Sequence, residues 1–149
     1  MKKIVWGVLL IFTLTLQAQE AKVVLESWRL GADYVIFVNL KNKGMKINKG
    51  CEEIQSHCQV WAVLAEVSTK KLGPSDLSGG KNIGASLCHK QENAQVLFAR
   101  NAKGRQATFC LFSDGSMVDS GGLLLAAKMN DAKNDTEKDT KKGKRVKCL

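Results

Sequence analysis

Hydrophobic and polar positions divide the chain into an apolar N-terminal run, several short β-rich runs and a charged C-terminal end. Residues 4–16 are mainly apolar, follow two lysines and precede the small residue Ala18, which is the pattern of a Sec-type signal peptide. A membrane anchor is the alternative, but a span needs roughly 20 apolar residues, and polar residues begin at Gln17. We therefore predict a signal peptide over residues 1–18 and a periplasmic or secreted mature protein.

Strand signals dominate the next part of the chain, so we predict a β-rich N-terminal half over residues 19–72. Residues 33–40, DYVIFVNL, are rich in β-branched and aromatic types and end at a Lys-Asn-Lys-Gly turn, which predicts a strand. Residues 22–30 fit either a strand or one short helix, and we favour the strand.

Residues 51–70, CEEIQSHCQVWAVLAEVSTK, fit two alternatives. Ile54, Cys58 and Trp61 recur at helical spacing, whereas QVWAVLAEV also suits a strand that is buried on both faces. Cysteines seven positions apart on one helix lie roughly 10.5 Å apart, which is beyond the reach of a disulfide. If Cys51 pairs with Cys58, the two must close a loop, and a strand is then favoured for the residues that follow.

A second module is predicted after a break in the pattern. Residues 73–81 contain the only proline among several glycines and serines, which predicts a linker. The module over residues 82–127 begins with a short helix, for which Asn82 is a candidate N-cap. Residues 94–100 and 105–112 then predict two strands, because an Asn-Ala-Lys-Gly sequence between them is a hairpin signal.

The C-terminal end is highly charged, so we predict a disordered basic tail over residues 128–149, which has too few apolar side chains to fold. The chain carries a net charge of +9, of which two charges belong to Lys2 and Lys3 and four belong to this tail. The remaining body gives no reason to expect a nucleic-acid partner. The tail suggests attraction to an anionic lipid or cell-surface polymer, and a solvated terminus is the alternative.

Cysteine usage agrees with export. The five cysteines occupy positions 51, 58, 88, 110 and 148, all beyond the predicted signal peptide. In an oxidising compartment, paired cysteines are more often disulfides than metal ligands. Because five is odd, at least one thiol is unpaired or pairs outside the chain. Cys148, beside Lys147, is the candidate free thiol, and it could link two copies of the chain.

Residues 82–123 contain a motif in which a cysteine after an asparagine and an alanine is followed by a glycine-containing hairpin and by Cys-x-Phe-x-Asp-Gly-Ser. The matching residues are Asn82, Ala85, Cys88, Gly104, Cys110, Phe112, Asp114, Gly115 and Ser116. This segment resembles a small bacterial exported domain of unknown function that is often labelled a haemolysin. The resemblance implies an exported domain on a paired-cysteine scaffold. We do not extend lytic activity to this chain.

On the scaffold that this resemblance implies, a disulfide between Cys88 and Cys110 would attach the short helix to the hairpin. Closing such a loop stabilises the fold by about 3.4 kcal/mol when only chain entropy is counted. Small exported domains need such cross-links because their hydrophobic cores are thin. The predicted fold class is α+β: a small disulfide-stapled helix plus antiparallel β-hairpin module with a β-rich N-terminal half.

Candidate chemistry is sparse. Asp114, Ser116 and Asp119 have oxygen-ligand character, but no alternating acids with a closing glutamate form a calcium loop. Serine catalysis needs a positioned base, and the chain has two histidines, His57 and His89, with no Gly-x-Ser-x-Gly elbow. The same histidines beside cysteines do not have the spacing of a zinc ribbon or finger. We therefore predict no catalytic residue, no cofactor and no metal.

The function predicted from the sequence is an exported, non-enzymatic binding protein of the cell envelope or the extracellular space. Its partner and specificity are not encoded in any motif. The alternative is a small inhibitor or modulator of exported hydrolases, because a stapled hairpin can present a rigid loop. Trp28 and Trp61 are either core aromatics or a binding face, and the core is favoured.

Overall fold

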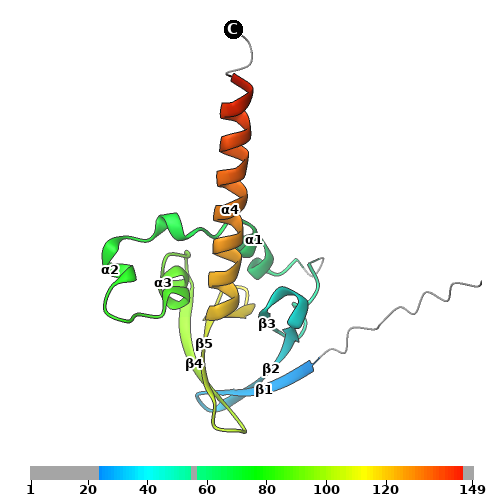
Figure 1. Cartoon of the computed structure of the whole chain (residues 1–149). Helices are drawn as coiled ribbons and strands as arrows, with labels where there is room; N and C mark the ends of the chain where they lie inside the picture. Colours follow the sequence, from blue (N-terminus) through cyan, green and yellow to red (C-terminus); the bar gives the residue numbers. More distant parts are fainter. Residues whose placement is uncertain (1–23, 55–56, 146–149) are drawn as a thin grey trace, which may run out of the picture.

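The computed structural model describes residues 24–54 and 57–145. Figure 1 shows a β-barrel with helices packed over one end and a long C-terminal helix that projects away from it. The predicted signal peptide and Cys148 lie outside the described residues.

Within these residues the elements largely follow the local sequence signals. The strands are β1 (Val24–Leu30), β2 (Asp33–Leu40), β3 (Met45–Asn48), β4 (Gln95–Asn101), β5 (Gln106–Leu111) and β6 (Met117–Asp119). The helices are η1 (Lys41–Lys43), α1 (Gln59–Glu66), η3 (Thr69–Lys71), α2 (Pro74–Leu77), α3 (Ile83–His89) and α4 (Ser120–Arg145). The four predicted strands are confirmed. So is the helix capped by Asn82, whose side chain accepts a hydrogen bond from the N–H of Ala85.

The strands close into one antiparallel barrel in the order β1-β2-β3-β6-β5-β4. The barrel is closed by two seams between distant strands: β1 pairs with β4, and β3 pairs with β6 at Ile47 and Val118. The α+β class is confirmed, but the finer prediction of a separate helix-plus-hairpin module beside a β-rich half is wrong. Both predicted halves contribute three strands to a shared barrel, because each half would otherwise leave strand edges unpaired.

The two three-stranded units repeat one another about a pseudo-two-fold axis. A shift of 71 positions carries Arg29 to Arg100 and Ile47 to Val118, and each of these pairs is directly opposed across a seam. The hydrogen bonds beside β3 and β6 are also duplicated. Asn48 accepts a bond from the N–H of Met117, 2.7 Å away, and Asp119 accepts one from the N–H of Lys46.

The barrel interior is filled by aromatic side chains. Phe37 of β2 and Phe109 of β5 are fully buried and stack with ring centroids 4.1 Å apart. Trp28 meets Phe109 edge to face at 5.4 Å. Ala99 occupies the position on β4 that corresponds to Trp28 on β1, 71 residues earlier. Because Ala99 is small, the barrel interior has room for the indole ring of Trp28.

A second core lies between the outer surface of the barrel and the helices. Ile47 and Val118 point into it from the seam, and Leu123 and Ala127 enter it from α4. Helices α3 and α4 approach closely because Gly84 has no side chain. A Cβ atom at this position would lie 2.0 Å from the carbonyl oxygen of Ser120.

Two segments differ from their predicted structure. The strand favoured after Cys58 is wrong, because Gln59–Glu66 forms α1. The predicted linker at residues 73–81 includes the short helix α2, in which Asp76 accepts a hydrogen bond from the N–H of Gly73. Asp76 also forms an ion pair with Lys90 at the end of α3, at 3.1 Å.

The predicted disordered tail is also wrong for residues 128–145, which continue α4 to Arg145. Asp131 on this helix is buried and accepts hydrogen bonds from the side chains of Ser68 and Thr69 and from the N–H of Thr69. Composition alone missed this because the packed first half of α4 provides a nucleus, and extending an existing helix costs little. Figure 1 shows the remainder of α4 projecting beyond the body.

Candidate functional site

The Ser-Asp-Gly-Ser segment, the most conspicuous polar motif in the sequence, has a structural role in this fold. Asp114 accepts a hydrogen bond from the N–H of Gln59 at 2.6 Å, and Ser116 Oγ accepts one from the N–H of Val60 at 3.1 Å. Ser116 also donates to Asp114 from its hydroxyl and from its N–H. These bonds satisfy the free N–H groups at the start of α1, whose own N-cap, Cys58, offers no such bond. The motif therefore caps a distant helix.

The carboxyl groups of Asp114 and Asp131 both have a lowered pKa. Burial raises the pKa of Asp114, but hydrogen bonds from the Ser116 hydroxyl and from the N–H groups of Gln59 and Ser116 outweigh it and lower the pKa overall. For Asp131, burial likewise raises the pKa, and the bonds from Ser68 and Thr69 outweigh it. The charged form of each carboxylate is therefore favoured in the folded state.

We expect the folded state to lose stability in acid for this reason. A carboxyl group whose pKa is lower when folded stabilises the protein above its unfolded pKa of about 3.9, and this contribution disappears as the pH falls through the folded pKa. Asp131→Ala should lower the free energy of unfolding by about 1–3 kcal/mol at neutral pH, and by progressively less below about pH 4.

Urea unfolding between about pH 7 and about pH 2 would measure this difference. Asp135→Ala is the matched control on the same helix, because Asp135 forms an exposed ion pair with Lys70 that should contribute less than about 1 kcal/mol. A loss in Asp131→Ala that is constant across the pH range would contradict the role given to the charged form.

Four of the five cysteines form disulfides in the structure, Cys51 with Cys58 and Cys88 with Cys110. These two disulfides indicate a non-cytoplasmic environment. Among the helices that the structure describes, none is long and apolar enough to cross a membrane. The first disulfide closes the loop before α1, and the second joins α3 to β5.

The remaining candidate groups are not brought together. Asp119 lies on β6 and accepts hydrogen bonds from the N–H groups of Lys46 and Gly122, whereas Asp114 and Ser116 bond to each other and to α1. His57 lies in the disulfide loop with a φ of 57°, and His89 ends α3. In the described ranges, no group of three His, Cys, Asp or Glu side chains could hold a metal ion.

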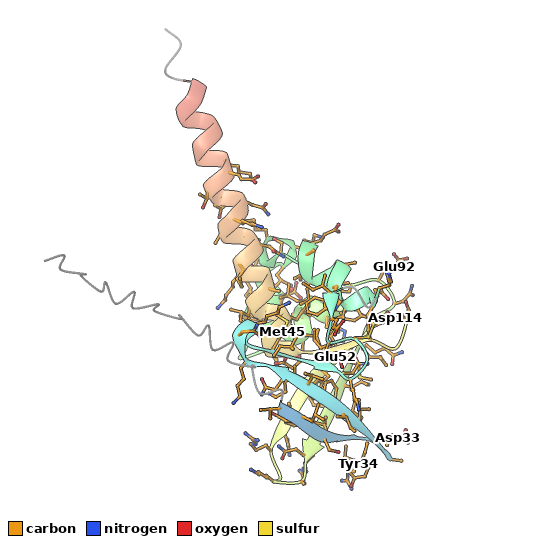
Figure 2. The ribbon with its side chains drawn as sticks, turned by 90° about the vertical axis from the view of Figure 1, so that its right-hand side faces the viewer. Asp33, Tyr34, Met45, Glu52, Glu92 and Asp114 are labelled. Carbon is orange, nitrogen blue, oxygen red and sulfur yellow. A yellow bond between two sulfur atoms is a disulfide. The ribbon has the colours of Figure 1, made fainter. Side chains whose placement is uncertain are left out.

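An apolar groove of about 520 Å³ lies between the β2–β3 connection, α1 and α4. It is lined by Asn42, Lys43, Gly44, Met45, Ile54, Trp61, Leu64, Ala65, Leu125, Ala126, Met129 and Asn130, and we call it the Trp61 groove. Figure 2 shows Met45, one of the lining residues, at the foot of α4. Ile54 and Met129 at its edges are 59% and 63% exposed. Large apolar side chains therefore meet solvent along a concave surface.

Trp61 is held in one orientation within this groove. Its indole N–H donates to the carbonyl oxygen of Cys51 at 2.9 Å, so the disulfide loop fixes one edge of the ring. The ammonium group of Lys43 lies 4.4 Å from the ring centroid, which is a cation–π contact. Of the two tryptophans in the described residues, Trp28 is a core residue, as favoured from the sequence, whereas Trp61 lines a surface groove.

The polar groups at the groove have defined partners or lie at its rim. The side-chain amide of Asn130 donates to the carbonyl oxygens of Leu64 and Val67, which satisfies the last turn of α1. Lys43, at the opposite side, is in no ion pair with any other residue that the structure describes. The groove thus combines an apolar floor with an available positive charge.

Comparisons with known proteins add no identity: no family model matches the chain, and neither does any curated protein or solved structure. The resemblance of residues 82–123 to the exported haemolysin-labelled domain therefore stays a prediction.

Sequence reasoning missed the Trp61 groove because its walls come from three segments far apart in the chain. The one local signal was Trp61 itself, which the sequence left as either a core aromatic or part of a binding face.

Proposed function

We propose that this protein is an exported, non-enzymatic binding protein of the cell envelope or the extracellular space, and that the Trp61 groove binds an apolar segment of an acidic partner protein. The observation that carries the proposal is the concave apolar surface around an oriented tryptophan. Exposed apolar surface of this kind is typical of interaction sites, and tryptophan is the residue type most enriched among energetically dominant contacts.

The side chains of the groove suit an apolar helix or strand. Met129 and Met45 have flexible thioether side chains that can adapt to the shape of a ligand. Leu125 is more than a third exposed, so it can gain contact area without any rearrangement of the core. An amphipathic segment inserts its apolar face into such a groove through residues at helical spacing.

Charge favours an acidic partner over a basic one. Lys41 and Lys43 lie on η1 beside the groove, and Lys128 precedes Met129 on α4. None of these lysines forms an ion pair with a described residue. Acidic side chains that flank an apolar segment would therefore meet unpaired positive charge, which increases the association rate and the specificity.

Two synthetic peptides of about 12 residues test the proposal. Both carry leucines along one helical face, and the other positions are glutamates in one peptide and lysines in the other. We expect the acidic peptide to bind the mature protein at least about tenfold more tightly than the basic one, as measured by calorimetry. Met129→Asp should weaken that binding at least about tenfold.

Leu77→Asp is the matched control, because Leu77 lies on α2 and is 55% exposed but does not line the groove. It adds the same charge at a similarly exposed apolar position, so peptide binding should be unchanged. Equal losses in Met129→Asp and Leu77→Asp, or no binding of either peptide, would overturn the groove as the binding site. The alternative of a hydrolase inhibitor gains no specific support from the described residues.

A further inference from the structure

A second unusual surface lies on the barrel itself, on the outer face of β2, β1, β4 and β5. The register of these strands places Tyr34, Arg29, Arg100 and Gln106 side by side, one from each strand. We call these four residues the arginine row. All four are exposed, and Figure 2 shows Tyr34 at the end of the barrel far from α4.

The centre of the arginine row is electrostatically unfavourable as it stands. Arg29 and Arg100 are directly opposed across the β1–β4 seam, where facing side chains lie roughly 5 Å apart at their Cβ atoms. Like charges in this arrangement destabilise a sheet. Neither arginine forms an ion pair with any residue in the described part of the chain. A bound anion would remove this repulsion.

A hollow with an aromatic wall adjoins the two arginines. It has a volume of about 530 Å³ and is lined by Arg29, Gly31, Phe98, Ala99, Arg100 and Gln106. Phe98 is 80% exposed, which is unusual for phenylalanine on a strand. At Gly31, no atom lies within 4 Å of the place that a Cβ would occupy, so the hollow stays open at the β1–β2 turn.

The symmetry of the arginines matches one kind of group. Arg29 and Arg100 are equivalent positions of the internal repeat and both line the hollow, so two guanidinium groups are available to one ligand. Each guanidinium group can donate two parallel hydrogen bonds to an oxyanion. A phosphate presents enough oxygens for two such groups at once, and the ring of Phe98 can contact an apolar or aromatic substituent on it.

We infer that the arginine row and Phe98 form a binding site for the phosphate group of a phosphomonoester with an apolar or aromatic substituent. The phosphate could belong to a soluble ester or to a lipid headgroup, and the chemistry of recognition is the same. This site uses no residue of the Trp61 groove, so it is independent of the function proposed above.

Phenyl phosphate is the probe, added to the mature protein with its disulfides intact and followed by calorimetry and by the NMR signals of the arginine side chains. We expect binding that weakens about tenfold in Arg29→Gln and in Arg100→Gln, which corresponds to the loss of a charged contact. Inorganic phosphate should bind more weakly than phenyl phosphate, and Phe98→Ala should abolish that difference.

Arg105→Gln is the matched control, since Arg105 lies in the β4–β5 turn and does not belong to the arginine row. It removes the same charge and should leave affinity unchanged. Equal weakening by Arg105→Gln and Arg29→Gln would overturn the site, because it would indicate nonspecific attraction to a basic surface. Absence of phenyl phosphate binding at millimolar concentration would overturn it as well.

Vesicles distinguish the two sources of phosphate. Phosphatidic acid in phosphatidylcholine vesicles should bind the protein through Arg29 and Arg100, in competition with phenyl phosphate, if the natural ligand is a lipid headgroup. Binding of phenyl phosphate without binding of these vesicles supports a soluble ester. Vesicle binding that is unaffected by Arg29→Gln and by phenyl phosphate would place the lipid contact elsewhere on the protein, and it would contradict a lipid headgroup as the ligand of this site.

Discussion

Replacing Phe109 with alanine should lower the free energy of unfolding by about 3–5 kcal/mol. Phe109 is fully buried, stacks on Phe37 and meets Trp28 edge to face, so its removal leaves a cavity bordered by two aromatic rings. These neighbours lie on the paired strands β1 and β2 of a closed barrel, which limits how far they can move to fill the space. Urea unfolding monitored by far-UV circular dichroism would measure the loss.

Phe98→Ala is the matched control for this prediction. It removes the same side chain from a strand of the same barrel, but Phe98 is mostly exposed, so the free energy of unfolding should change by less than about 0.5 kcal/mol. Similar losses in Phe109→Ala and Phe98→Ala would contradict the packed interior described above. Phe37→Ala should resemble Phe109→Ala, since the two rings are equivalent positions of the repeat.

Removing the disulfide between Cys88 and Cys110 should have the second largest effect. Replacing both with alanine should lower the free energy of unfolding by about 3.4 kcal/mol, because the unfolded chain regains the freedom of a loop with a sequence separation of 22. Both residues are completely buried between α3 and β5. The alanine pair therefore also leaves a small cavity, which adds to the entropic loss.

The other disulfide provides an internal comparison. Cys51 and Cys58 close a loop with a sequence separation of 7, for which the same relation gives about 2.4 kcal/mol. Thermal unfolding of the two double-alanine variants should rank them in this order. A larger loss from the Cys51 and Cys58 replacement would show that the loop before α1, and with it the position of Trp61, contributes more to stability than α3 does.

The parts of the fold that the sequence predicts are those encoded by neighbouring residues. The strand at 33–40 has an uninterrupted run of strand-forming side chains, and its structure has the same bounds, Asp33–Leu40. Asn82 caps α3 because an asparagine side chain can reach an N–H three residues on. In both cases the residues that decide between strand and helix lie within the segment itself.

The errors occur where a distant residue decides the structure. Residues 59–66 form a helix because Asp114 and Ser116, more than fifty positions later, satisfy its first N–H groups. Residues beyond 128 remain helical because Asp131 accepts hydrogen bonds from the N–H and the hydroxyl group of Thr69 in η3. Neither contact has a signature in the local pattern, and the closure of the barrel depends on pairings of the same long range.

A search for internal repeats would have found part of this arrangement. Gly44 and Gly115 both adopt a positive φ in the turns before β3 and β6, at a separation of 71 residues. Phe37 and Phe109 are separated by 72 residues and occupy the same place on β2 and β5. The sequence similarity between the units is limited to such positions, so the repeat becomes clear only from the register of the strands. Likewise, the Trp61 groove and the arginine row require the closed barrel before their residues meet.

The placement of the disulfides has a consequence for the covalent integrity of the molecule. One bond lies wholly before the exposed Gly79–Gly80 segment and the other lies wholly after it. A single proteolytic cut there would yield two peptides with no covalent connection. They would remain associated through non-covalent contacts, namely the seams of the barrel, the core under the helices and the hydrogen bonds of Asp114, Ser116 and Asp131. In this sense the polypeptide is a pseudo-homodimer whose two subunits have been fused into one chain.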